Sequence, residues 1–150
     1  MNKNHKSISV YFDNKHNLIA IPSVNGWDLD LVYALKFPYN TEDLESFILG
    51  ALNQCFSKKP VDPFKRKVSV LAEYRGVKTW KSAVKGLGAV DVSWLKDSGY
   101  EMMPTKKDPK MKYAFMFLPD KIISLGDDFI PGQLAEAFFK AMAISEENGI

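Results

Sequence analysis

Cysteine and histidine are scarce in this chain of 150 residues, which contains one cysteine and two histidines. Cys55 alone cannot form an intramolecular disulfide, and the residue spacings typical of zinc sites are absent. We expect Cys55 to be a buried, unreactive thiol. Because His5 precedes the first expected strand and His16 lies in a turn, we expect solvated side chains rather than a metal site. The sequence therefore predicts no metal and no cofactor, and a reducing compartment, the cytoplasm.

Long apolar runs are missing as well. No window approaches the roughly 18 apolar residues of a membrane span. The basic start is not followed by an apolar run, so we expect no signal peptide. The hydrophobic fraction of 46% and the charged fraction of 25% are typical of a soluble globular protein. The length predicts a single domain, residues 1–150, that buries roughly 70% of its unfolded surface.

Arginine is rare, and the charges are unevenly distributed. Residues 58–112 contain 14 basic and 6 acidic side chains, whereas the rest of the chain contains 6 basic and 12 acidic ones. Such a division is typical of solvated faces, or of charged surfaces that attract a partner. Only Arg66 and Arg75 provide the guanidinium groups that dominate specific phosphate and base contacts. This scarcity weakens a nucleic-acid interpretation.

Recognisable catalytic groups are also absent. No serine lies in a nucleophile elbow, and no triad can be assembled from the sequence. Gly86 and Gly88 precede a strand pattern rather than a helix, unlike a phosphate-binding loop. Asp127 and Asp128 are more typical of acids that precede a helix than of a catalytic pair. We therefore predict that the chain is not an enzyme and that it works by presenting a surface.

Hydrophobic periodicity predicts the elements of the first half. Alternating residues indicate a hairpin of strands 7–13 and 18–24, followed by a third strand over residues 29–37. Asn40 or Thr41 is expected to cap a helix with acidic residues in its first turn. The apolar stripe of this helix consists of Leu44, Phe47, Ile48, Ala51, Leu52 and Cys55.

The second half shows the same order of strands followed by a helix. Residues 68–74 are ambiguous and favour a helical turn, and Thr79 is expected to cap a short helix that turns Trp80 inward. Strands are predicted over residues 89–95, 99–104, 111–118 and 121–125, with a basic loop at 106–110. The last helix, residues 131–144, is expected to bury Leu134, Ala135, Phe138, Phe139 and Met142. Strand groups that each end in a helix predict an α+β fold with antiparallel sheets.

Two groups of residues are candidates for binding. The first is acidic and could form one negative patch that complements a basic nuclease: Asp28, Asp30, Glu42, Asp43 and Glu45, with Asp127 and Asp128 as a second choice. The second is aromatic, because Trp80, Trp94 and Tyr100 could stack nucleobases beside nearby lysines. The two tryptophans also fit a core position, since each lies on the apolar phase of its own element.

The order of motifs resembles the immunity proteins of bacterial contact-dependent growth inhibition systems, a family formerly known as a domain of unknown function. The matching segments cover most of the chain: Val10-Tyr11-Phe12, Ile21-Pro22-Ser23, Gly76 to Trp80, Val90 to Trp94, Gly99-Tyr100, Met103-Pro104-Thr105, Ser124-Leu125-Gly126 and Leu134 to Ala137. No single motif is specific, and residues 57–67 match little. We transfer no binding residues from the family, because these positions look structural.

The resemblance implies a small cytoplasmic protein that binds and blocks the C-terminal toxin domain of a large surface-delivered effector. Such toxins are often nucleases, several of them ribonucleases, and some of these immunity proteins have a fold like the Whirly single-stranded nucleic-acid binders. Acidic side chains would then occupy the phosphate-binding cleft of the toxin, with no membrane and no direct nucleic-acid contact. The alternative is an RNA or single-stranded DNA binder that uses the basic residues 58–112. Neither interpretation predicts an oligomeric state.

Overall fold

A computed structural model describes residues 3–149 of the chain. Its strands are β1 (His5–Phe12), β2 (Leu18–Val24), β3 (Trp27–Asp28), β4 (Tyr33–Leu35), β5 (Gly88–Leu95), β6 (Gly99–Asp108), β7 (Ala114–Phe117) and β8 (Ile123–Leu125). Its α-helices are α1 (Thr41–Leu52), α2 (Val70–Arg75), α3 (Trp80–Ala83) and α4 (Gln133–Glu147). Short 3-10 turns occupy Pro63–Lys65, Pro109–Met111 and Pro119–Lys121. Within the described residues, no helix is long and apolar enough to cross a bilayer.

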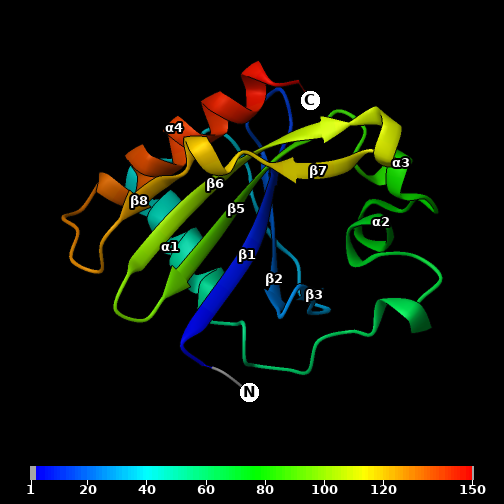
Figure 1. The fold of residues 1–150 in the computed structure, drawn as a ribbon, viewed down its shortest axis with the longest axis horizontal. Coiled ribbons are helices and arrows are strands. Elements are labelled where there is room, and N and C mark those ends of the chain that lie inside the picture. The colour runs from blue at the N-terminus through cyan, green and yellow to red at the C-terminus, as the bar shows by residue number, and fades with distance from the viewer. Residues whose placement is uncertain (1–2, 150) are drawn as a thin grey trace.

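The strands form one antiparallel sheet in the order β3-β2-β1-β5-β6-β7, with β4 also paired to β2 and β8 to β6 (Figure 1). Each strand group is followed by a long helix, α1 in the first half and α4 in the second. This arrangement confirms the predicted α+β class with antiparallel pairing. The likeness to Whirly proteins stays a prediction.

The predicted first hairpin is confirmed, but the third strand is broken. β1 pairs with β2 so that Val10 lies opposite Ala20. The expected strand over residues 29–37 is replaced by β3 and β4, which pair with the two ends of β2. Pro22 lies between these pairings, and its carbonyl accepts the Leu29 amide at 2.8 Å. Because proline has no N–H to donate, the ladder is interrupted at this point.

One face of the sheet is covered by α1 and α4 (Figure 1). The strands contribute the alternate residues Ile8, Val10, Phe12, Val90, Val92 and Met102, all fully buried. The helices contribute Leu44, Ile48, Leu134 and Phe138 to the same cluster. Burial of each such side chain stabilises the fold by about 1.5–3 kcal/mol, so this face holds most of the packing energy.

The opposite face is covered by the short helices α2 and α3, and Phe115 of the edge strand β7 packs against the same cluster (Figure 1). The Ser69 hydroxyl accepts the Ala72 amide at 3.1 Å, and the Thr79 hydroxyl accepts the Ser82 amide at 3.1 Å. Both helices therefore begin at a side-chain cap, which confirms the predicted helical turn and the short helix after Thr79. With only 6 and 4 residues, they leave part of the sheet uncovered.

Two further predictions for the second half need correction. β6 extends to Asp108, so part of the expected basic loop is strand, and β7 begins only at Ala114. Lys112 and Tyr113 have positive φ angles of 58° and 62°, which complete the turn between the strands. The predicted burial of Phe139 is wrong: the residue is 38% exposed and stacks on Tyr39 with centroids 6.4 Å apart. α4 turns Phe138 to the sheet, so its neighbour faces outward.

Candidate functional site

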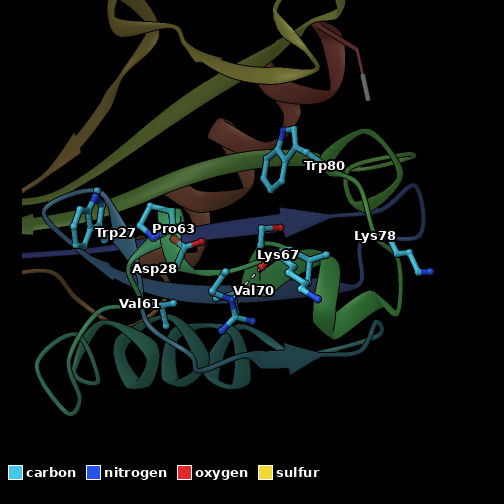
Figure 2. A pocket seen from close by; sticks show the side chains of 12 residues that line it. Trp27, Asp28, Val61, Pro63, Lys67, Val70, Lys78 and Trp80 are labelled. Atoms are coloured by element: carbon cyan, nitrogen blue, oxygen red, sulfur yellow. Dashed lines mark hydrogen bonds between the residues drawn. The ribbon is translucent and has the colours of Figure 1, made fainter.

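Two adjoining cavities, each of about 340 Å³, lie on the face that α2 and α3 cover incompletely. The first lies between β3, the segment 61–70 and Trp80 of α3 (Figure 2). The second lies between β1, β5 and β7. Trp80 lines both cavities, and we call the pair the Trp80 groove. Trp80 is half-buried, so the prediction that it is a core residue is only partly correct.

Aromatic rings form one wall of the groove. The Trp80 ring lies 6.4 Å from Tyr11 and 6.3 Å from Phe115, both edge-on, and Tyr11 lies 5.7 Å from Phe115. The Trp80 Nε1–H donates to the Tyr113 carbonyl at 3.2 Å. This hydrogen bond ties α3 to the β6–β7 hairpin and fixes the orientation of the indole.

Two half-buried carboxyl groups, Asp28 and Asp91, lie in the groove. Asp28 is opposite Ser23 on β2, and Asp91 is opposite Ser9 on β1, so both project from the face that carries Tyr11. Burial raises the pKa of each to about 6, and for Asp28 the Arg66 guanidinium opposes this effect. Burial raises the pKa of Tyr11, and both carboxylates raise it further. At neutral pH the groove therefore contains two largely ionised carboxylates.

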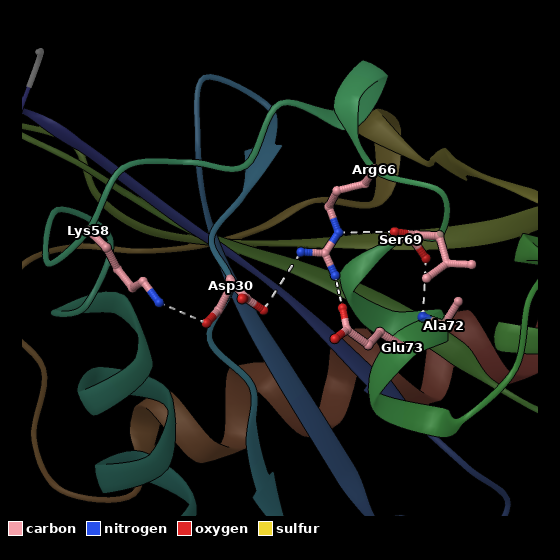
Figure 3. A network of polar contacts seen from close by, with 7 residues as sticks. Asp30, Lys58, Arg66, Ser69, Ala72 and Glu73 are labelled. Carbon is pink, nitrogen blue, oxygen red and sulfur yellow. Dashed lines mark hydrogen bonds and ion pairs between the residues drawn. The ribbon is translucent and has the colours of Figure 1, made fainter.

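Of the two cavities of the groove, only the first is bordered by basic side chains. Arg66, Lys67 and Lys78 line it together with Asp28. Arg66 pairs with Glu73 and, at 3.9 Å, with Asp30, while its Nε–H donates to the Val68 carbonyl at 3.0 Å (Figure 3). Lys58 Nζ donates to the Asp30 carbonyl at 3.3 Å. These contacts hold the loop before α2 against the edge of the sheet.

The acidic residues Asp28, Asp30, Glu42, Asp43 and Glu45 do not form the single patch that was predicted. Asp30 is exposed beside Asp28, near the end of β2. That end of the sheet lies against the C-terminal end of α1. The Cys55 thiol, just after α1, donates to the Ser7 carbonyl at 3.1 Å, and Ser7 pairs with Ser23, the residue opposite Asp28. Glu42 and Asp43 are exposed in the first turn of this helix of 12 residues, about 14–15 Å along its axis from its C-terminal residue.

Glu45 has a structural position. It is buried, and its carboxylate accepts the Gly132 amide at 3.0 and 3.1 Å and the Ala135 amide at 3.0 Å. Gly132 is the N-cap of α4 and has no side chain that could accept hydrogen bonds from these amides. Glu45 of α1 therefore caps α4 and also meets the positive end of its dipole. A surface role in binding does not fit this burial.

Asp127 and Asp128 are exposed in the loop between β8 and α4. The Trp94 Nε1–H donates to Asp127 Oδ1 at 2.6 Å, so Asp127 anchors this loop to β5. Gly99 lies under the same loop: a Cβ atom there would come within 2.5 Å of the Gly126 carbonyl carbon. Gly99 and Gly126 are motif residues, and their close backbone approach explains why no side chain fits at Gly99, whereas a Cβ atom at Gly126 would meet no neighbour within 4 Å.

Within residues 3–149 no group of three His, Cys, Asp or Glu side chains could hold a metal ion. His16 is not simply solvated, because its Nε2 pairs with Glu146. Cys55 is fully buried, and burial raises the pKa of its thiol. A third cavity, of about 530 Å³, is bordered by Lys81, Lys85 and Lys107.

Sequence reasoning missed Asp91, Tyr11 and Phe115. The signal for Asp91 is its place between Val90 and Val92 on a central strand, where the two valines face the main core. The carboxyl group must then face the other side of the sheet, beside Ser9 of the neighbouring strand. The pairing register was needed to see that these residues and Tyr11 share one face.

Comparisons with known proteins show a shared fold. No family model matches the sequence, and no curated protein is a significant match. A protein of unknown function from Neisseria meningitidis superposes with a TM-score of 0.68 at 18% identity, covering 95% of this chain and 97% of that chain. A chain of a CdiA-CT/CdiI toxin and immunity complex from Yersinia pseudotuberculosis superposes with a TM-score of 0.65 at 14% identity, covering 93% and 97%.

Proposed function

We propose that this chain is an immunity protein that binds a toxin domain and blocks its activity. The observation that carries the proposal is the likeness in fold, over 93% of the chain, to a chain of a toxin and immunity complex. The order of sequence motifs independently resembles contact-dependent growth inhibition immunity proteins. A structural superposition does not depend on these motifs, so the two observations support each other.

The proposed partner is the C-terminal domain of a large surface-delivered effector, and the proposed place of action is the cytoplasm of the producing cell. The proposed toxin is a nuclease, in particular a ribonuclease. A surface that binds phosphates is basic, and the ionised Asp91 carboxylate, in a cavity that no lysine or arginine lines, complements such a surface. Tight interfaces commonly combine an aromatic centre with complementary charge, which the groove offers.

Blocking is proposed to occur by occlusion: the immunity protein covers the toxin active site and excludes RNA. Of the acidic residues predicted from the sequence, Asp28 lines the groove, and exposed Asp30 lies beside it. Glu42 and Asp43, and separately Asp127 and Asp128, lie elsewhere on the surface. Their contact with a toxin stays a prediction, and the groove is the proposed centre of the interface.

The test is co-expression with the C-terminal domain encoded by a large neighbouring reading frame. We expect the toxin domain alone to stop growth and this chain to restore it, with a stoichiometric complex on gel filtration and loss of RNA cleavage by the purified mixture. A toxin domain from a different effector serves as the specificity control. Continued growth arrest, despite good expression of this chain, would refute the proposal.

The third cavity favours a second candidate function, nucleic-acid binding. Lys81, Lys85 and Lys107 surround it together with Tyr113. Against this, both guanidiniums are engaged within the chain, since Arg66 pairs with Asp30 and Glu73 and Arg75 donates to the Ala83 and Lys85 carbonyls. Binding to homopolymeric single strands that falls steeply between about 50 and 200 mM salt would favour this second function.

A further inference from the structure

We infer that the second cavity of the Trp80 groove receives one cationic side chain of the toxin, a lysine or an arginine. Asp91 is its ion-pair partner, and Tyr11, Trp80 and Phe115 form its aromatic wall. The inference rests on the proposed function, because it names the chemistry of the toxin group at the centre of the contact.

Asp91 has no partner of its own in the part of the chain that the structure describes. Among the described residues its carboxylate makes no hydrogen bond or ion pair, and burial alone raises its pKa to about 6. A carboxylate that is partly removed from water without a compensating cation destabilises the free protein. A cationic side chain that enters the cavity supplies the missing charge. The cavity is therefore better suited to a complex than to the isolated chain.

The aromatic wall favours the same ligand. Rings attract cations that lie over their faces within about 6 Å of the centroid, and guanidinium groups also stack on them. The chain already uses this contact outside the cavity, with Lys81 Nζ 5.0 Å from the Tyr113 centroid, and at one ring of the wall, with Lys107 Nζ 5.6 Å from the Phe115 centroid. Lys107 does not neutralise Asp91, because its ammonium donates to the Val84 carbonyl and no charge opposes the burial effect on Asp91.

Charge distinguishes the two cavities of the groove. In the first, Arg66, Lys67 and Lys78 accompany Asp28, and Arg66 lowers the pKa that burial has raised. The second cavity has a carboxylate and no lining lysine or arginine. The chain therefore neutralises the charge of Asp28 with its own basic side chains, whereas the charge of Asp91 is available to a cation of the partner.

The rim of the second cavity is apolar and lies at an exposed edge of the sheet. β7 lies at the end of the strand order, and its Phe117, which lines the cavity, is 57% exposed. Exposed apolar side chains around a charged centre are typical of interfaces that exclude water from a central ion pair. The apolar edge would thus exclude water from the ion pair with Asp91 and strengthen it.

The first experiment measures binding of the co-expressed toxin domain to the wild-type chain and to Asp91→Asn, which keeps the shape and removes the charge. We expect binding to weaken at least about 30-fold, mainly through faster dissociation. Asp97→Asn, on the exposed β5–β6 turn, is the matched control and should bind like the wild type. If the wild type binds and Asp91→Asn binds equally well, this inference is wrong while the proposed function stands.

A second experiment needs no toxin. Ethylguanidinium and butylammonium, the analogues of the two side chains, are titrated while the Trp80 indole N–H resonance is followed by NMR. We expect a saturable shift with at least one of them in the wild type and in Asp97→Asn, and none in Asp91→Asn. Absence of any shift with both cations, or an equal shift in Asp91→Asn, overturns the inference. A shift in a chain that fails to bind the toxin domain refutes the proposed function alone.

Discussion

The two faces of the sheet are built from the same strands but differ in what covers them. On one face, Ile8, Val10 and Phe12 of β1 are fully buried under α1 and α4. On the other, Ser9 is only half-buried, and Tyr11 lines the cavity that contains Asp91, next to the cavity that contains Asp28. The period of two in a strand separates these sets of side chains completely. The closed face can therefore supply stability while the open face holds groups that cost stability and suit a partner.

The largest effect is expected on the closed face, from Phe138→Ala. Phe138 is fully buried, so removal of its ring should lower the free energy of unfolding by about 3–5 kcal/mol. Its neighbour Phe139 is 38% exposed, and Phe139→Ala should cost less than about 1 kcal/mol. Urea unfolding of both variants measures the contrast, and similar losses for the two would mean that α4 is rotated on the sheet.

The next largest effect is expected from the contact between α1 and α4. Glu45→Ala leaves the Gly132 and Ala135 amides without an acceptor, which should lower the free energy of unfolding by about 2–3 kcal/mol. Glu42→Ala, an exposed change in the same helical turn, should cost less than about 1 kcal/mol. Denaturant unfolding separates the two, and equal effects would show that Glu45 acts only through the charge of its own helix.

The open face can be tested through the pH dependence of Asp91. Its pKa rises from the ordinary 3.8 to about 6 in the fold, so the folded state holds the proton more tightly than the unfolded state. This contribution is fully present below about pH 4 and is lost as the pH rises through 6. Asp91→Asn should therefore gain about 1–3 kcal/mol over the wild type between about pH 4 and pH 7.5.

Urea midpoints across this pH range provide the measurement, with Asp97→Asn as the control that should follow the wild type. Parallel curves for Asp91→Asn and the wild type would mean that the carboxylate is already compensated. Because the predicted change is stabilising, a loss of toxin binding in Asp91→Asn cannot be attributed to unfolding.

The smallest effect is expected outside both faces, at Asp127. Asp127→Ala removes the acceptor of the Trp94 Nε1–H and should cost about 1 kcal/mol, with altered tryptophan fluorescence. Adjacent Asp128→Ala makes a matched control with little expected change in stability. If toxin binding falls equally in both variants, the loop contacts the toxin directly and the structural role of Asp127 is secondary.

Much of the fold could be predicted because its signals are local. Alternation identified β1 and β2, and of the predicted caps Asn40 begins α1 and Thr79 begins α3. The cap of α2, Ser69, was not predicted. The break in the third strand was missed, although Pro22 provided a signal, because its effect falls on a neighbouring strand rather than on its own. Phe139 was wrongly predicted to be buried, because the sequence alone does not show where the buried stripe of a helix ends.

The candidate site was harder to predict because its parts are distant in the sequence. Asp28 was identified from its charge, but Tyr11, Trp80, Asp91 and Phe115 come together only through the strand order and the packing of α3. Glu45 was grouped with surface acids, since nothing near it in the sequence shows that Gly132 lacks a cap. Its hydrogen-bond partner is 87 residues away.

By itself, therefore, the sequence determined the class of fold, the two strand groups that each end in a helix, and the apolar phase of most elements. These features depend on contacts within a few residues, where periodicity and capping operate. The tertiary structure alone decided which carboxylates remain at the surface, which one caps a helix, and which two lie in a groove. Burial and the loss of solvation arise from segments far apart in the chain, so only the assembled sheet determines them.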